Sequence, residues 1–238
     1  MTAGTRTRSG SGARSGSRSK GGQDERTVRA LLDAHGRTYA AEAAIRLRDT
    51  PQPLYRLLVL SHLLSARIQA AIAVAAARAL HDAGMRDARR MESATWQQRV
   101  DALGEGGYRR YDERTATQLG DAARLVLDKY GGDLRRMRDA ADGDTQALRS
   151  LLREVPGLGP AGTDIFLREA QAVWPQVAPY LDGKALQGAE RLGLPTDPPK
   201  LAALVDESDM ASLAAALVRV ALDRHIAEEL QGELRDKG

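Results

Sequence analysis

A two-glycine turn at residues 155–164 places backbone amides where an anion could bind. The sequence there reads VPGLGPAGTD, and apolar residues at helical spacing precede and follow it. Gly157 and Gly159 permit positive φ angles, and Pro160 suits the first turn of a second helix. The unpaired N–H groups at such a helix start, together with the helix dipole, favour a phosphate. The turn is interpreted either as a phosphate-binding helix-hairpin-helix or as an ordinary connection between two packed helices.

The segment 181–195, LDGKALQGAERLGLP, follows the turn and places Asp182 just before an expected helix. A carboxylate can stabilise positive charge that develops on a sugar while it orients or deprotonates water. Glycosidases that act on ordinary sugars use carboxylates for the same electronic reason. Asp182 is equally suited to cap the helix expected to begin at Gly183, and the two roles are compatible.

Two upstream segments add cationic and aromatic groups. The first, residues 60–67, reads LSHLLSAR, and the second, residues 106–116, reads GGYRRYDERTA. Arg109 and Arg110 lie between Tyr108 and Tyr111, a combination that suits base stacking with phosphate contact. The two tyrosines are one helical turn apart, so we expect one of them to pack in the core instead. We expect both tryptophans, Trp96 and Trp174, to serve packing.

In this order and spacing, the four segments resemble the helix-hairpin-helix DNA glycosylase superfamily, the endonuclease III-like proteins, over roughly residues 50–222. The resemblance implies an all-α fold of two helical lobes, with duplex DNA in the cleft between them and a base rotated out of the stack. It implies that Asp182 is the catalytic residue. The residues that it implies for DNA binding are Gly157, Gly159, Ala161, Gly162, Arg67, Arg109, Arg110 and Lys184. Arg67 would fill the gap left by the extruded base. The alternative interpretation of Arg67 is an arginine exposed on the surface at a helix end.

The sequence departs from the family pattern in the hairpin. Bifunctional members carry a lysine there, whose amine forms a Schiff base with the sugar. Ala161 occupies the matching position here. The nearest lysine, Lys184, lies two positions after Asp182, and residues two apart on a helix face different directions. The resemblance therefore implies a monofunctional glycosylase, a hydrolase of base-excision repair without a lyase step.

Composition limits the cofactors. The chain has no cysteine, so it lacks the ligands of the family's four-cysteine iron–sulfur cluster. Its four histidines are far apart in sequence, and no spacing typical of a metal site occurs. We expect no metal and no organic cofactor, except that the hairpin could hold a monovalent cation.

Length, hydropathy and charge agree with a helical DNA-binding protein without requiring one. The 238 residues can bury a sizeable core, and the repeated helical pattern without alternating strands predicts an all-α fold. No long uncharged apolar run occurs, so we expect no membrane span. The formal net charge is +3, but residues 1–23 contain five basic and no acidic residues, so the remainder carries −2. DNA binding must then depend on asymmetric placement of charge.

The domain organisation is predicted from composition shifts and the resemblance. We expect a disordered basic tail at 1–24, N-terminal helices at 25–53 that pack with the C-terminal lobe, and a central lobe at 54–142. The hairpin and C-terminal lobe would occupy 143–231, with a short tail at 232–238.

Three functions remain open from the sequence. The first is DNA glycosylase activity, and the second is a catalytically inactive DNA-binding protein on the same scaffold. The third is a helical interaction module whose hairpin contacts protein. For either of the first two we expect double-stranded DNA as the partner, a monomer, and a cytoplasmic or nucleoid-associated location.

Overall fold

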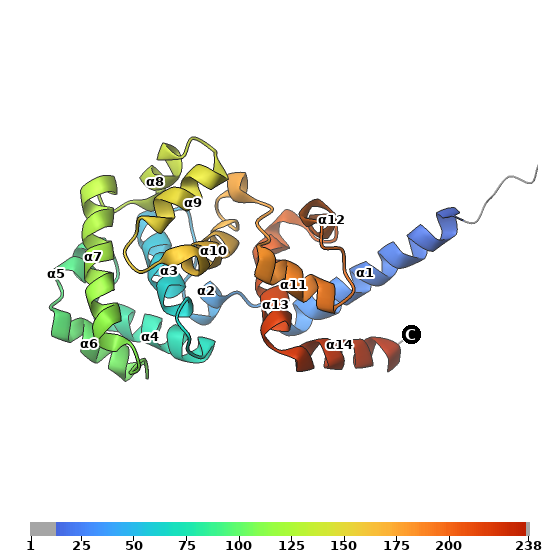
Figure 1. Cartoon of the computed structure of the whole chain (residues 1–238), viewed down its shortest axis with the longest axis horizontal. Helices are drawn as coiled ribbons and strands as arrows, with labels where there is room; N and C mark the ends of the chain where they lie inside the picture. Colours follow the sequence, from blue (N-terminus) through green and yellow to red (C-terminus); the bar gives the residue numbers. More distant parts are fainter. Residues whose placement is uncertain (1–12, 237–238) are drawn as a thin grey trace, which may run out of the picture.

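The computed structural model describes residues 13–236, and every regular element in that range is helical (Figure 1). The predicted all-α fold is confirmed. The α-helices are α1 (Ala13–His35), α2 (Tyr39–Glu42), α3 (Pro51–Leu64), α4 (Ala70–Asp82), α5 (Ala88–Ser93), α6 (Trp96–Glu105), α7 (Asp112–Tyr130), α8 (Leu134–Ala140), α9 (Thr145–Arg153), α10 (Gly159–Ala170), α11 (Gly183–Arg191), α12 (Pro198–Ala202), α13 (Met210–Leu222) and α14 (Arg224–Asp236). Short 3₁₀ turns occur at Pro175–Val177 and Glu207–Asp209.

Local capping explains where many of these helices start and stop. Thr95 and Gln98 form a reciprocal capping box at the start of α6, and Gly131, with φ of 62°, ends α7 in the left-handed region. Asp87 and Asp133 accept backbone N–H bonds at the starts of α5 and α8. These two short helices are too brief for a periodic pattern to predict them.

Helices extend into both predicted tails over the residues that the structure describes. Helix α1 begins at Ala13 rather than at Glu25, and α14 continues to Asp236. Val28 and Leu31 are buried, and the helix extends N-terminally from this docked part, as Figure 1 shows. Burial of Ala227 and Leu230 anchors α14 in the same way. Residues 1–12 and 237–238 of the predicted tails lie outside the described residues.

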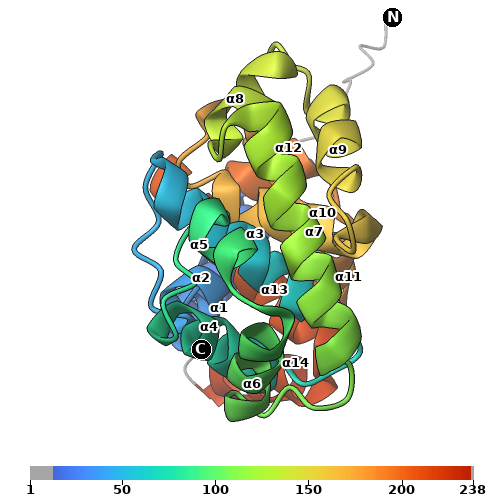
Figure 2. The ribbon, with the colours of Figure 1, turned by 90° about the vertical axis from the view of Figure 1, so that its left-hand side faces the viewer.

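Two hydrophobic cores divide the molecule. The first comprises buried residues between Tyr39 and Tyr180, and the second comprises Val28 and Leu31 with buried residues from Leu181 to Leu230. In the first lobe α3 packs against both α4 and α10, and Figure 2 shows α7 crossing the near face of this lobe. In the second lobe α11 packs along α13, which also contacts α1.

This division corrects the predicted boundaries. The hairpin helices α9 and α10 contribute Leu148, Leu152 and Phe166 to the first core, so the change of lobe falls at residues 180–181 instead of 142–143. The predicted N-terminal unit 25–53 is also divided, because α1 packs in the second lobe whereas α2 and α3 pack in the first. The apolar face of α10 packs against α3, which lies far away in sequence. Periodicity shows that a helix has an apolar face but not which helix covers it.

Partly buried polar groups join the two lobes. Arg219 of α13 donates to Glu42 Oε1 at 2.7 Å and to the His35 carbonyl at 3.1 Å, and its guanidinium lies 4.4 Å from the Tyr39 ring centroid. Cation–π contact and charged hydrogen bonds therefore act on the same side chain. They fix the link between α1 and α2 against the second lobe.

The closest helix contact in the second lobe depends on a glycine. A Cβ added to Gly188 of α11 would lie 1.9 Å from the carbonyl oxygen of Leu217 in α13, a backbone atom that cannot rotate away. We expect Gly188→Ala to lower the free energy of unfolding by about 1–3 kcal/mol, because the helices must separate. Urea denaturation measures this change. The control is Gly104→Ala, since Gly104 lies in α6 with no atom within 4 Å of the added Cβ, and it should not destabilise the protein. Equal stability of Gly188→Ala and the wild type would contradict the packing described.

Candidate functional site

The hairpin between α9 and α10 has the backbone that its glycines predict. Gly157 and Gly159 have φ angles of 80° and 59°. Within residues 13–236 the amides of Gly159 and Ala161 donate to no backbone oxygen, whereas the Gly162 amide bonds to the Leu158 carbonyl at 3.2 Å. Two N–H groups at the start of α10 thus remain available for an anion, with the positive end of the helix dipole behind them.

Gly162 does not belong with the DNA-binding residues predicted from the hairpin. It is buried, and an added Cβ would lie 2.8 Å from Leu158 Cδ1 and 3.5 Å from the Ser61 carbonyl oxygen of α3. Its amide is already used within the helix ladder. Gly162 therefore allows close packing of the hairpin on α3, and a DNA strand cannot reach it.

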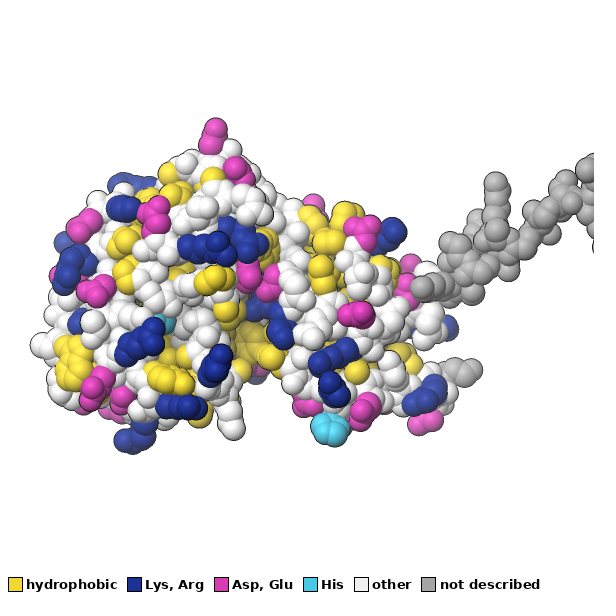
Figure 3. All heavy atoms as spheres, in the orientation of Figure 1, with side chains coloured by type: hydrophobic (Ala, Val, Ile, Leu, Met, Phe, Trp, Pro, Cys, Tyr) yellow, Lys and Arg dark blue, Asp and Glu magenta, His cyan; other side chains and the backbone are white. Residues whose placement is uncertain are grey.

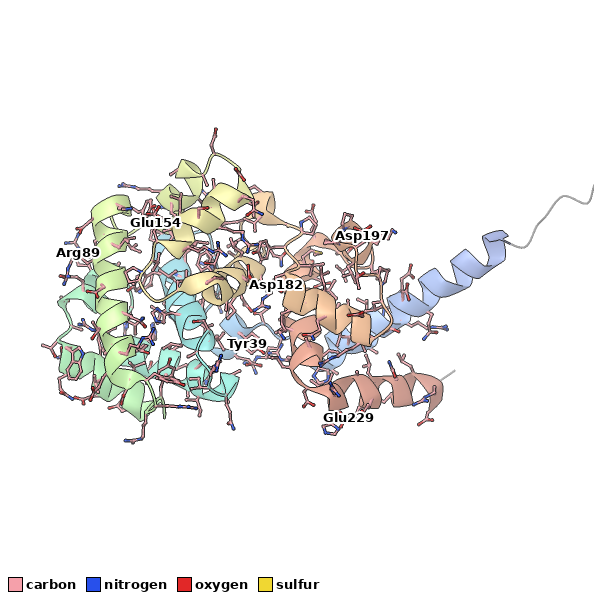
Figure 4. The ribbon with its side chains drawn as sticks, in the orientation of Figure 1. Tyr39, Arg89, Glu154, Asp182, Asp197 and Glu229 are labelled. Carbon is pink, nitrogen blue, oxygen red and sulfur yellow. The ribbon has the colours of Figure 1, made fainter. Side chains whose placement is uncertain are left out.

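Asp182 lies at the junction of the lobes, at the start of α11 (Figure 4). Its Oδ1 accepts the Ala185 amide at 3.0 Å, so its predicted capping role is confirmed. Arg168 of α10 donates from Nη1 to both carboxylate oxygens at 3.2 Å. Each of these two side chains is only 9% exposed. The carboxylate thus sits at the positive end of one helix and is paired with a cation from the other lobe.

Arg168 connects Asp182 to the hairpin. Ala161 and Arg168 are seven residues apart on α10, about two helical turns, and so share a face. Arginine side chains on helices lean toward the N-terminus, in the direction of Ala161. Ala161 therefore lies on the face of α10 that carries Arg168.

Three further residues occupy this region, and sequence reasoning missed them. Tyr180 donates from its hydroxyl to Asp164 Oδ1 at 2.6 Å, and Arg149 Nη2 lies 3.1 Å from the same oxygen. Burial, with the Asp164 carboxylate, raises the pKa of the Tyr180 hydroxyl. The guanidinium of Arg149 also lies 5.9 Å from the Tyr180 ring centroid. This cluster ties α9, α10 and the segment before Asp182 together. The only feature of the sequence that pointed to this cluster is that Tyr180 lies close to Asp182 in the chain.

A cavity of about 400 Å³ opens beside the hairpin. Its walls come from three of the segments singled out in the sequence: the end of α3 with the following loop, the segment that leads into α7, and the hairpin itself. The lining residues are His62, Ser65, Ala66, Arg67, Tyr108, Tyr111, Arg114, Thr115, Gln118 and Gly157. A Cβ added to Gly157 would lie 2.4 Å from His62 Cε1, so only glycine lets the hairpin approach this wall.

His62 and Gln118 form the buried part of this cavity. His62 Nε2 and Gln118 Oε1 are 3.2 Å apart, and His62 is 5% exposed. Burial lowers the pKa of His62 to about 4; Gln118 opposes this decrease and the Arg114 charge adds to it. The imidazole is therefore neutral near pH 7, and Nε2–H donates to the Gln118 oxygen.

The remaining predicted residues are divided between surface and core. Arg67, Arg109, Arg110 and Lys184 are exposed; Arg110 lies 5.2 Å from the Tyr111 ring centroid, and Lys184 donates to Gln187 at 2.9 Å. Of these four, Arg67 alone lines the cavity. As expected of one tyrosine of the pair, Tyr108 is buried.

Of the two tryptophans, Trp174 is buried as predicted. Trp96 is 41% exposed, and its indole N–H donates to Thr117 Oγ1 of α7 at 3.1 Å.

The face that carries the hairpin is mixed in charge. Figure 3 shows Lys and Arg side chains spread over the first lobe and beside the junction of the lobes, where the surface is hollowed and hydrophobic side chains lie at depth. Acidic side chains lie between them. Any attraction to phosphate on this face thus comes from local placement of arginines, since the chain after residue 23 carries net negative charge.

The described residues contain neither a cluster of metal ligands nor a helix suited to cross a membrane. Between residues 13 and 236, no group of three or more His, Cys, Asp or Glu side chains is arranged to hold a metal ion. Over the same range, no helix combines the length and apolar character that crossing a bilayer requires.

Comparison with known proteins shows a distant likeness to a solved structure. No family model matches the chain, and no curated protein matches it. Among solved structures, the chain is similar to a trapped endonuclease III–DNA covalent intermediate, described as an estranged-adenine complex. The identity is 16%, the TM-score is 0.46, and the match covers 82% of this chain and 85% of that one.

The buried His62 should make stability depend on pH. Its pKa is lower in the folded protein than the ordinary value of 6.5, so the unfolded chain binds more protons between those values and stability falls as pH drops. From pH 7 to pH 5 we expect His62 to contribute a loss of about 2 kcal/mol. Urea denaturation of the wild type and His62→Gln at both pH values isolates this contribution. A constant difference between the two proteins would contradict it.

The pair between Arg168 and Asp182 should be strongly coupled. Removing one partner leaves the other charge buried and unpaired, so we expect Arg168→Met and Asp182→Asn each to cost about 3–5 kcal/mol, and the double variant to cost much less than their sum. A double-mutant cycle measured by chemical denaturation gives the coupling energy. Lys129 and Glu154, 2.6 Å apart but exposed, provide the control pair and should show a smaller coupling. Additive effects at Arg168 and Asp182 would show that the pair does not join the lobes.

Proposed function

We propose that this protein is a DNA glycosylase that hydrolyses the bond between a damaged or mismatched base and its sugar in duplex DNA. The observation that carries the proposal is that α10 brings the four motif segments together. At its N-terminal end the hairpin meets the 60–67 and 106–116 segments around one cavity. Toward the other end of α10, Arg168 donates to the carboxylate of Asp182. Four segments with the order of the glycosylase superfamily thus converge on the hairpin and the helix that follows it.

In the proposed reaction Asp182 acts on the sugar. A carboxylate near the anomeric carbon stabilises the positive charge that develops as the base leaves, and it orients the attacking water. The Ala185 amide at the N-terminus of α11 and the guanidinium of Arg168 both hold this carboxylate in a fixed direction. The base must leave the stack for this contact, because the bond is inaccessible inside the duplex.

The proposed enzyme has no lyase step. Ala161 supplies no amine at the hairpin position where bifunctional family members carry a lysine, and the Lys184 amine is bonded to Gln187 on the exposed side of α11. Without a Schiff base the product is an abasic site in an intact strand. The available amides of Gly159 and Ala161, with arginines on the same face, would hold the phosphates.

A second function, DNA binding without chemistry, is favoured by one observation. Arg168 neutralises the Asp182 carboxylate, and each side chain is only 9% exposed. A carboxylate in this state stabilises a developing cation less well than an unpaired one. If bound DNA does not displace Arg168, the scaffold recognises a lesion and releases no base.

A panel of duplexes that carry uracil, oxidised or alkylated bases separates these functions. For the glycosylase we expect strand cleavage of one substrate only after alkali treatment, and Asp182→Asn should slow base release at least about 100-fold. The control is Asp197→Asn, because Asp197 precedes α12 and makes no side-chain cap bond. The double variant Arg168→Met with Asp182→Asn keeps the junction uncharged and tests the same loss if the single variant does not fold.

Each other outcome selects a different function. Salt-dependent binding to a lesion without release by the wild type would establish the binding protein. Unchanged release by Asp182→Asn would disprove the assigned catalytic residue. Failure to bind any duplex at low salt would favour the protein-interaction module.

A further inference from the structure

One polar face of α10 lies along the chain segment that ends at Asp182. Residues 164, 168 and 171 are three or four positions apart, so they share a side of the helix. Asp164 Oδ1 accepts the Tyr180 hydroxyl at 2.6 Å, and Gln171, at the C-terminal end of α10, bonds the Tyr180 backbone. Arg168, between them, donates to Asp182. Three successive contacts thus hold this segment against one helix.

Gln171 holds the Tyr180 backbone at both of its polar groups. Its Oε1 accepts the Tyr180 amide at 2.8 Å, and its Nε2 donates to the Tyr180 carbonyl at 3.1 Å and to the Arg168 carbonyl at 2.8 Å. The first two bonds form the same two-point pair that facing residues exchange in an antiparallel sheet. Gln171 is only 4% exposed, so an apolar side chain there would leave the Tyr180 amide and carbonyl unpaired away from water.

Asp164, Gln171 and Tyr180, which we call the Tyr180 clamp, lie next to the carboxylate that the proposed function uses. Two residues of chain span at most about 7 Å, so the Cα atom of Asp182 stays within about this distance of the clamped Tyr180. Tyr180 belongs to the first hydrophobic core, whereas Leu181 belongs to the second. The clamp therefore fixes the chain where it leaves the first lobe, immediately before Asp182.

The helix that carries the clamp also carries the available amides of the hairpin. Gly159 and Ala161 lie in the first turn of α10, and Asp164 and Gln171 follow in the same helix. Because a helix of this length is rigid, its contacts with the segment before Asp182 set the spacing between the hairpin amides and the carboxylate. A misplacement of about 1 Å between a bound substrate and a catalytic group can lower a rate about 100-fold.

We propose that Asp164 and Gln171 are positioning residues, which act through Tyr180 to hold Asp182 at a fixed distance from the hairpin amides. The inference rests on the proposed function, because it assigns the Tyr180 clamp to the reaction at Asp182. The clamp orients the carboxylate toward the sugar and does not itself bind DNA. Its loss therefore lowers the rate of base release and leaves the affinity for the duplex unchanged.

Base release in a single turnover and duplex binding, measured separately on the substrate that the lesion panel identifies, test this inference. Tyr180→Phe removes only the hydroxyl, and Gln171→Met removes the bonds to the Tyr180 backbone with little change in side-chain volume. We expect the rate of base release to fall about 10-fold to 100-fold in each variant. The Kd for the duplex should stay at the wild-type value. Both measurements are made at a temperature at which circular dichroism shows every variant to be folded.

Two variants of Asp164 separate the hydrogen bond from the charge. Asp164→Asn keeps an oxygen that accepts the Tyr180 hydroxyl and loses the charge that pairs with Arg149, so it should retain most of the wild-type rate. Asp164→Leu removes the acceptor and should lower the rate as much as Tyr180→Phe does. The two changes together should lower it no further, because both remove one interaction.

The matched control is Tyr55→Phe. Tyr55 is a buried tyrosine of the first core, and its hydroxyl lies near Asp87 and Arg99 instead of the junction. This variant should release the base at the wild-type rate. If Gln171→Met does not fold, Tyr180→Phe, which lacks a single oxygen atom, provides the test.

The outcomes separate the inference from the function on which it rests. A wild-type rate in Tyr180→Phe, or equal losses of rate in Asp164→Asn and Asp164→Leu, would overturn the inference and leave the glycosylase proposal standing. A fall in duplex affinity that accounts for the fall in rate would also overturn it, because the clamp would then act on binding. Absence of base release from every duplex by the wild type would overturn both.

Discussion

The ion pair between Arg168 and Asp182 is the interaction on which the arrangement of the two lobes depends. It joins α10 of the first lobe to the start of α11 in the second, with both side chains almost fully removed from water. Desolvation of two charges is costly, and the cost is offset only when geometry and additional hydrogen bonds are good. Here the carboxylate also accepts the Ala185 amide at the positive end of α11, so its charge is compensated from two directions.

Helix α10 contacts both lobes because consecutive residues on it bond to different lobes. Arg168 reaches the second lobe, whereas Glu169 accepts the Tyr39 and Ala40 amides at 3.0 Å each, within the first lobe. Burial raises the pKa of Glu169, and these amide bonds oppose the increase. Phe166 packs edge-on against Trp174 with ring centroids 5.5 Å apart. A helix held in so many directions keeps the hairpin at its start fixed relative to both lobes.

The rigid hairpin separates two chemical environments on one face. Near the junction, two carboxylates are each paired with an arginine, Asp164 with Arg149 and Asp182 with Arg168, and Tyr180 also donates to Asp164. Beside the hairpin, the cavity contains donors and cations without any carboxylate among its lining residues. The proposed function uses the carboxylate of Asp182 in the first environment, whereas the donors of the second environment suit a ligand rich in hydrogen-bond acceptors.

The sequence alone determined the helical class and the backbone of the hairpin, because helical periodicity and glycines that permit positive φ are local properties. It also placed Asp182 at the start of a helix, since a capping aspartate acts on residues only three positions away. The partners of buried charges depend on the packing of distant segments. Arg168, the packing of Gly162 on α3, the cavity around His62 and Gln118, and the change of lobe at residues 180–181 were therefore decided only by the tertiary structure.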